Sequence, residues 1–259
     1  MSQIRPPAVA GYFYPAEEQA LRSWLGAHLS LNQGSHRQPR ALLLPHAGYR
    51  YSGALAAQGV ATLARQGIAR VVILAPAHRV PLRGVALPAD DCRAFQTPLG
   101  TTVLDMQALA ELTRHDGFIR YEEAHRQEHA IEVLLPLLQY RLSDFSLVPL
   151  VVGECTALWL ASHLTPLLDG RTLLISSSDL SHFMTQEEAR VLDEQTLARV
   201  LGLTPELGPH QACGCFGLNA LLLLAREHEW QASLIGQSDS GVITGERERV
   251  VGYGCVGFY

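Results

Sequence analysis

Residues 41–49 read Ala-Leu-Leu-Leu-Pro-His-Ala-Gly-Tyr, a short apolar run that ends in proline, histidine and glycine. Four consecutive apolar residues bounded by turn-forming residues are typical of a buried strand in a parallel sheet. Residues 70–78 repeat this arrangement, because Arg-Val-Val-Ile-Leu-Ala precedes Pro76, Ala77 and His78. Both stretches therefore predict a strand that is covered on two faces and ends beside a histidine.

The rest of the chain alternates between apolar runs and segments with apolar residues at helical spacing. Further strands are predicted at residues 84–87, 145–152, 172–176, 231–235 and 250–258. Helices are predicted at residues 53–65, 105–115, 128–142, 156–168, 185–201 and 213–228. Asp105 is expected to cap its helix, and Thr185 with Glu188 matches a capping box. Alternating strands and helices imply crossover connections, so we predict an α/β fold with a mostly parallel central sheet and helices on both faces.

Composition narrows the class of protein. The chain has 259 residues, of which 47% are hydrophobic and 17% charged, so residues 1–259 are expected to form a single domain with a large core. The formal charge of −5, with no basic cluster, argues against a nucleic-acid partner. No apolar run approaches the roughly 20 residues that span a bilayer, so no membrane association is expected. Residues 31–40, with glycine, serine and proline, are predicted to be a loop.

The cysteines indicate the compartment. Their number is five, which is odd, and their spacing suggests no disulfide framework. A reducing compartment fits this pattern, and the N-terminus lacks an apolar run of signal-peptide length. We therefore expect a cytoplasmic protein.

Three histidines follow predicted strands directly. His46 and His78 come after the first two strands, and His182 closes the run Ser177-Ser178-Asp179-Leu180-Ser181-His182 after a third. Ligands of α/β sheets bind beyond the carboxyl ends of the strands, so these side chains should gather at one edge of the sheet. Asp179 is expected to lie there too.

Two further elements carry candidate chemistry. Cys213 opens a predicted apolar helix, where the helix dipole and free N–H groups would stabilise a thiolate for metal ligation or nucleophilic attack. His129 and Glu132 would share a helical face as an i, i+3 pair, with Glu128 pointing elsewhere. Such a pair can relay a proton or orient another histidine.

Each of these residues also has a purely structural interpretation. His46 or His78 could bond to a backbone carbonyl, Asp179 could cap a turn, and His182 could lie on the surface. A lone cysteine such as Cys213 is more often a small buried hydrophobe. His129 and Glu132 could be a solvated pair, and Cys215 is expected to pack in the core. The case for a site rests on the residues occurring together.

The same motifs resemble those of the Memo family, also known as component B of the AmmeMemoRadiSam system. The resemblance covers nearly the whole chain in order. Its motifs are the opening Arg5 to Pro15, Pro45-His46-Ala47-Gly48-Tyr49, Tyr51-Ser52-Gly53, Pro76-Ala77-His78, Glu128-His129-Ala130-Ile131-Glu132, Ser177 to His182, Cys213-Gly214 and Val251-Gly252-Tyr253.

This resemblance implies a fold similar to the class III extradiol, LigB-type dioxygenases, which bind non-haem Fe(II) through two histidines and a glutamate. His46 and His78 match the two histidine ligands, and Cys213 falls where the glutamate would be. His182 matches an acid/base histidine, and Asp179 lines the same pocket. Fe(II) is the implied metal, but a softer thiolate also suits Zn or Cu. Which of Cys213 and Cys215 faces the site is left open.

Three functions remain open at this point. The first is a metal-dependent oxidoreductase with ligands His46, His78 and Cys213, in which His182 and Asp179 handle the proton and a small molecule or peptide is the ligand. The second is a cysteine hydrolase with Cys213 as nucleophile and His182 as base. The third is a binding module for a phosphorylated peptide or a partner such as a radical-SAM protein. The chain could also form a homodimer.

Overall fold

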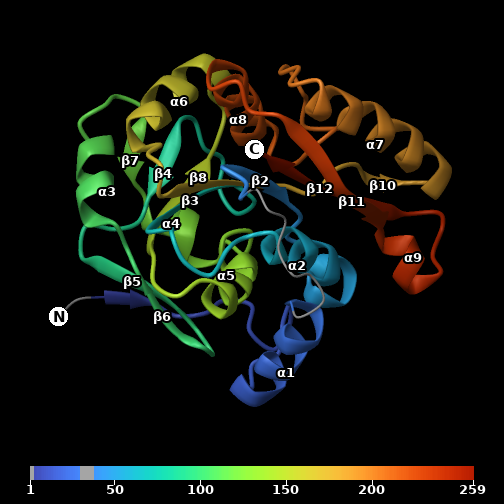
Figure 1. Ribbon diagram of the computed structural model, residues 1–259, viewed down its shortest axis with the longest axis horizontal. Coiled ribbons are helices and arrows are strands. Elements are labelled where there is room, and N and C mark those ends of the chain that lie inside the picture. The colour runs from blue at the N-terminus through green and yellow to red at the C-terminus, as the bar shows by residue number, and fades with distance from the viewer. Residues whose placement is uncertain (1–2, 30–37) are drawn as a thin grey trace.

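A nine-stranded mixed sheet forms the centre of the computed structural model, which describes residues 3–29 and 38–259 as one α/β domain (Figure 1). Its strand order is β10-β12-β2-β9-β3-β8-β4-β7, and β11 pairs with β12. The strands are β2 (Ala41–Leu44), β3 (Arg70–Pro76), β4 (Val85–Leu87), β7 (Phe118–Arg120), β8 (Ser146–Val152), β9 (Thr172–Ser177), β10 (His182–Met184), β11 (Ala232–Asp239) and β12 (Val250–Phe258). A separate three-stranded sheet contains β1 (Gln3–Arg5), β5 (Cys92–Thr97) and β6 (Gly100–Val103).

Helices cover both faces of the large sheet. On one face, α8 (Cys215–Glu227) packs on β3 and β9, α7 (Gln186–Leu201) packs on β12, and α6 (Ala157–Leu164) lies against α8. On the other face, α2 (Ala54–Ala61) packs on β2 and β12, and contacts α1 (Glu18–Leu29) and α5 (Leu135–Arg141). The shorter helices are α3 (Met106–Leu112), α4 (Glu122–Arg126) and α9 (Ser240–Thr244).

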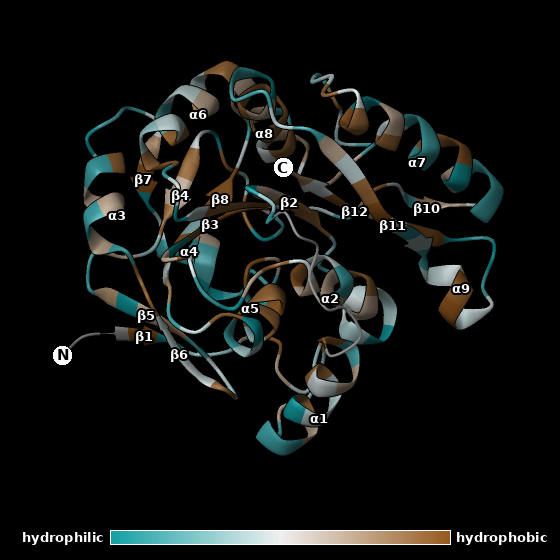
Figure 2. Cartoon of the chain, viewed as in Figure 1, coloured by the Kyte–Doolittle hydropathy of each residue, from teal (hydrophilic) through white to brown (hydrophobic). Residues whose placement is uncertain are grey.

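The four central strands, β2, β9, β3 and β8, are parallel, as the sequence predicted. The labelled strands β3 and β8 are largely brown in Figure 2, the colour of hydrophobic residues, and β2 and β9 are buried along their whole length. The outer strands differ from the expectation of a mostly parallel sheet, because β12 runs antiparallel to β2 and β4 antiparallel to β8. Each of these pairs joins strands that are far apart in the chain, so no local sequence pattern indicated their direction.

Several local predictions are confirmed. Asp105 caps α3 by accepting from the N–H of Ala108, and Thr185 with Glu188 forms the capping box of α7. The five cysteines are all free thiols. Residues 31–37 of the predicted loop lie outside the described residues. Within the described part of the chain, no helix is long and apolar enough to cross a membrane.

The helix predicted at residues 128–142 was wrong in its first half. After α4 the chain makes a turn, then a 3₁₀ helix (Glu132–Leu134), and only then α5. The Glu128 carboxylate accepts a hydrogen bond from the N–H of Ala130, two residues on, which offers the backbone an alternative to helical bonding. Pro136 lies in the first turn of α5, where a missing N–H costs nothing.

Glu132 anchors the N-terminal segment from this 3₁₀ helix. Its fully buried carboxylate accepts hydrogen bonds from Arg5 Nη1 at 2.7 Å, from the N–H groups of Ala8 and Val9 at 2.8 and 3.0 Å, and from Tyr14 Oη at 2.7 Å. Four donors therefore satisfy the hydrogen-bonding capacity of this buried side chain.

Replacing Glu132 with alanine should lower the free energy of unfolding by about 3–5 kcal/mol, because the buried Arg5 guanidinium and two N–H groups would lose their acceptor. Urea denaturation measures this loss. The control is Glu188→Ala, which removes the exposed carboxylate of the α7 capping box and should cost far less stability. A loss at Glu132 no larger than that at Glu188 would contradict the anchoring role.

Candidate metal centre

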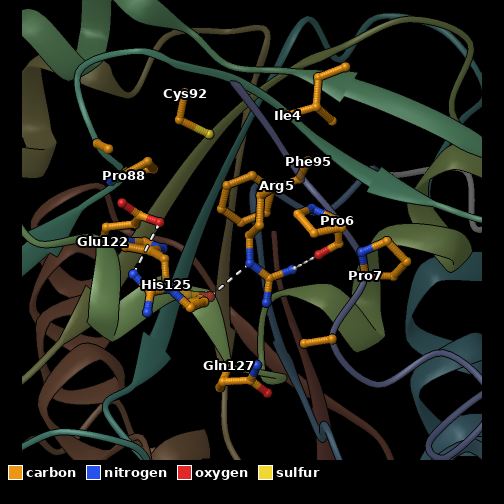
Figure 3. Close-up of a pocket in the computed structure, with 13 residues that line it drawn as sticks. Ile4, Arg5, Pro6, Pro7, Pro88, Cys92, Phe95, Glu122, His125 and Gln127 are labelled. Atoms are coloured by element: carbon orange, nitrogen blue, oxygen red, sulfur yellow. Dashed lines mark hydrogen bonds and ion pairs between the residues drawn. The ribbon is translucent and has the colours of Figure 1, made fainter. Parts of the chain in front are cut away.

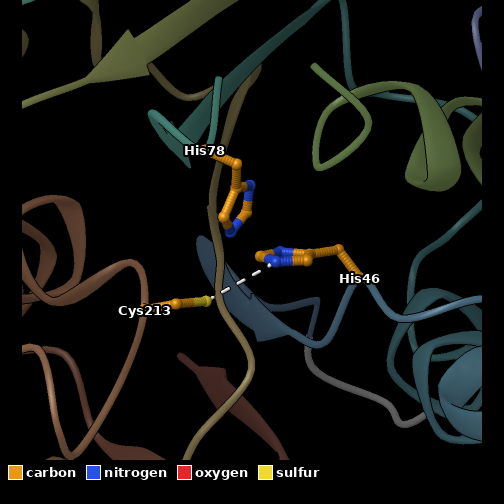
Figure 4. A group of neighbouring side chains, drawn as sticks. All are labelled: His46, His78 and Cys213. Atoms are coloured by element: carbon orange, nitrogen blue, oxygen red, sulfur yellow. Dashed lines mark hydrogen bonds between the residues drawn. The ribbon is translucent and has the colours of Figure 1, made fainter. Parts of the chain in front are cut away.

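Three side chains from separate elements meet at the carboxyl edge of the parallel strands. His46 follows β2, His78 follows β3, and Cys213 lies just ahead of α8. One donor atom from each, two imidazole nitrogens and one sulfur, all lie within 4.8 Å of one another (Figure 4). Cys213 Sγ is 3.5 Å from His46 Nε2. The predicted convergence of these three residues is therefore present in the fold.

The hydrogen bonds of His46 fix its tautomer. Ser177 Oγ donates to the carbonyl of Ala130 at 2.7 Å, so its lone pairs are left to accept from His46 Nδ1 at 2.8 Å. Nδ1 therefore carries the hydrogen, and Nε2 presents its lone pair toward Cys213. Burial, and then the proximity of His78, lower the pKa of His46 to about 3, so the imidazole is neutral.

Glu128 fixes His78 in the same sense. Its carboxylate accepts from the N–H of His78 and from Nδ1 of the same residue, each at 2.9 Å. Burial alone would raise the pKa of the Glu128 carboxyl. The hydrogen bond and the charge interaction with His78, together with the N–H of Ala130, have the larger effect and lower this pKa to about 2. A carboxylate on Nδ1 leaves Nε2 of His78 free to bind a metal, as in many protein metal sites.

The sulfur that faces the histidines belongs to Cys213. Its Sγ accepts from the N–H of Asp179 at 3.3 Å, whereas Cys215 is buried inside α8. The sequence had suggested that Cys213 opens this helix. The helix instead begins at Cys215 with Gly214 as its N-cap, so Cys213 lies just before the helix. Burial, and then the charge of Asp179, raise the pKa of the Cys213 thiol to about 12.

Gly214 permits the close approach of Cys213 to the end of β9. A Cβ at this position would lie 2.7 Å from the carbonyl oxygen of Ser177 and 2.9 Å from Cβ of Ser178. Neither backbone nor Cβ atoms can move away easily at such distances. The Gly214 N–H also donates to Ser178 Oγ at 2.8 Å. Glycine at this point therefore sets the position of the thiol.

A pocket of about 420 Å³ opens beside the three side chains, and three other predicted site residues line it: His129, Asp179 and His182. Asp179 Oδ1 accepts from the N–H of His46 at 2.9 Å, and burial raises the pKa of this carboxyl. His182 Nδ1 donates to the carbonyl of Leu180 at 2.8 Å, and no hydrogen bond of Nε2 is seen among the described residues.

His129 lies against both candidate histidine ligands. Its ring centroid is 4.8 Å from that of His78 and 5.4 Å from that of His46, and Phe13 covers it at 4.8 Å. Burial, and then His46, lower the pKa of His129 to about 4. A neutral imidazole thus forms part of the pocket wall.

The interpretation of His129 and Glu132 as a pair was wrong, because the helix that would align them does not form. The Glu132 carboxylate bonds to Arg5 and the N-terminal segment, while Glu128, which we expected to point elsewhere, holds His78. The sequence pointed to Glu128 only through its position directly before His129. Its partner, His78, lies 50 positions earlier in the chain, and local sequence patterns give no information on so distant a contact.

Comparison with known proteins identifies the family of the chain. The Memo-like protein family model matches residues 5–256. The chain belongs to the Memo family. A MEMO1 family protein of Thermoplasma volcanium is 33% identical over 98% of this chain and 97% of its own length. One of Methanothermobacter thermautotrophicus is 32% identical over 96% and 98%. The crystal structure of an uncharacterized Escherichia coli K12 protein covers 83% of this chain and 99% of its own, with a TM-score of 0.49 and 18% identity.

Substitution of Gly214 by alanine should destabilise this Memo protein by about 1–3 kcal/mol, because the new methyl group overlaps the end of β9. The matched control is Gly170→Ala, since a Cβ there meets nothing within 4 Å. Urea denaturation of both variants tests the difference. Equal stability of the two would mean that Gly214 is not needed for the approach of Cys213.

Acid should destabilise the metal-free protein through its buried histidines. Burial lowers the pKa of His46 to about 3 and that of His125 to about 4, and in the unfolded chain both titrate near 6.5. The unfolded state thus binds more protons below pH 6.5, so stability falls as pH falls from there toward the folded pKa values. At pH 5 each histidine accounts for about 2 kcal/mol.

Urea denaturation at pH 7 and at pH 5 measures this dependence. His125 lies away from the candidate centre, so His125→Gln isolates one contribution, and the loss of stability between the two pH values should be smaller in this variant. An unchanged difference would show that His125 titrates alike in both states.

Proposed function

We propose that this Memo protein is a metal-dependent, non-haem-iron oxidoreductase that holds Fe(II) with His46, His78 and Cys213. The observation that carries the proposal is that His46 and His78 are oriented in the same way by their hydrogen bonds. Both imidazoles donate from Nδ1 to oxygen acceptors, so both Nε2 lone pairs are free beside one sulfur. Two imidazoles and one thiolate are a donor set that Fe, Zn and Cu accept. Zn has no redox chemistry, and the resemblance to the extradiol dioxygenases favours Fe over Cu.

The chemistry of these three side chains fits a bound cation. The Cys213 thiol, with its pKa raised to about 12, stays protonated on its own, and its proton would be replaced by a metal ion. Bound Fe(II) would supply a redox-active Lewis acid with open positions for substrate or O₂.

The chain's own groups would bind the substrate and move its proton. His182 lines the pocket and donates from Nδ1 to the carbonyl of Leu180, so Nε2 is the ring nitrogen that would exchange a proton with a bound hydroxyl. Asp179 holds the backbone of His46 and lines the same pocket. Phe13, which covers the ring of His129, gives the pocket an apolar side that keeps water from the reacting group.

A cysteine hydrolase is supported less well. Cys213 Sγ is paired with His46 and with groups of Ser178 and Asp179, and no hydrogen bond joins it to His182 in the described residues. A nucleophilic cysteine also needs a lowered pKa, whereas burial raises that of Cys213.

Metal analysis after anaerobic purification tests the proposal. The wild-type protein should carry about one iron per chain, and His46→Ala should lower the iron content at least tenfold, because it removes one of three ligands. His228→Ala, at an exposed histidine outside the pocket, is the matched control and should keep its iron. Circular dichroism confirms that both variants fold. Equal iron in wild type and His46→Ala would rule out the centre, and stoichiometric Zn or Cu would rule out iron.

A further inference from the structure

A second pocket is lined in part by Gln127, the residue that precedes Glu128 (Figure 3). It has a volume of about 320 Å³ and lies between the N-terminal segment, β5, the loop after β4, and helix α4. This volume is within the range of small-molecule sites. None of its lining residues is a candidate metal ligand, so what it binds is a question separate from the proposed function.

The walls of this pocket are rigid and apolar. Proline rings at Pro6, Pro7 and Pro88 and the ring of Phe95 line it, together with Ile4. Rings have few rotatable bonds, so a ligand that contacts them costs little side-chain entropy. The pocket is thus preformed for an apolar molecule.

The charges around the pocket are already balanced. Arg5 donates from Nε to the carbonyl of His125, from Nη1 to Glu132 and from Nη2 to the carbonyl of Glu128, each at 2.7 Å. At the mouth, Glu122 and Arg126 form an ion pair at 3.4 Å.

His125 adds no charge to the pocket either. Its Nε2 is 2.9 Å from the carbonyl of Ala86, and burial lowers its pKa to about 4, so its ring is neutral. A charged ligand would lose its hydration in this pocket. Among the described lining residues, the buried polar atom without a hydrogen-bond partner is His125 Nδ1, which is an uncharged acceptor in the neutral ring.

We propose that this pocket binds a small uncharged molecule with an apolar ring. The pocket volume limits the size of the ligand, the ring-lined walls favour planar apolar surface, and the balanced charges exclude ions. The bound molecule would lie next to Arg5, whose Nη2 holds the carbonyl of Glu128.

Titration of 5-fluoroindole with the wild-type protein, followed by ¹⁹F NMR, tests the proposal. The fluorine signal should shift or broaden, and unlabelled indole should restore it. Indole-3-acetate at the same concentration should restore it at least tenfold less well, because its carboxylate has no partner. An unchanged signal with wild type would overturn the site, and equal competition by the two indoles would overturn the ligand class.

Variants locate the bound probe. Ala89→Leu fills the pocket from the loop after β4, and Ile4→Asp places an unpaired carboxylate on its half-exposed rim, so each should raise the Kd at least tenfold. Ala157→Leu, at a half-buried alanine on α6, is the matched control. Thr244→Leu narrows the pocket beside the candidate metal centre and should leave the Kd unchanged.

The outcomes are separable because Ile4 is partly exposed, so Ile4→Asp should fold even where Ala89→Leu does not. Unchanged binding by Ile4→Asp, or loss of binding by Thr244→Leu, would place the probe elsewhere and overturn the assignment.

Discussion

The candidate centre depends on one short turn, residues 128–130, which orients both imidazoles. The Glu128 carboxylate holds the main chain and Nδ1 of His78, and the carbonyl of Ala130 holds the Ser177 hydroxyl that receives Nδ1 of His46. The same carboxylate accepts from the N–H of Ala130, so the turn is closed on itself. Both lone pairs at the centre are therefore oriented by hydrogen bonds of two residues of this turn, Glu128 and Ala130.

The buried ion pair of Arg5 and Glu132 holds this turn in place. Arg5 bonds to the carbonyls of His125 and Glu128 and reaches Glu132, which is fully buried. Ion pairs of this kind often add no stability relative to an apolar replacement, but they are specific, since each donor has one geometry that satisfies it. In this protein that specificity fixes the position of Glu128, and through it the orientation of His78.

The sequence predicted the residues that depend on strand order and missed those that depend on tertiary contacts. His46 and His78 were found because each follows an apolar run, and parallel strands end at the same edge. Glu128 was missed because helical periodicity extended through residues 128–142, while the carboxylate-to-backbone bond that breaks the helix has no periodic signal. The choice of Cys213 over Cys215 depended on how closely Gly214 approaches Ser177, a contact between elements far apart in the chain.

The long separations between these partners imply that the centre forms only when the whole domain has folded. The contact between His46 and Cys213 joins positions 167 residues apart, and the contact between Arg5 and Glu132 joins positions 127 apart. Closing such loops has an entropic cost that isolated segments cannot offset, so no single strand–helix unit could hold the three donors together. The turn at residues 128–130 would have no fixed geometry before the N-terminal segment docks. The affinity of the candidate centre for the proposed metal would therefore depend on fold stability, because the interactions that orient the three side chains also hold the N-terminal segment on the domain.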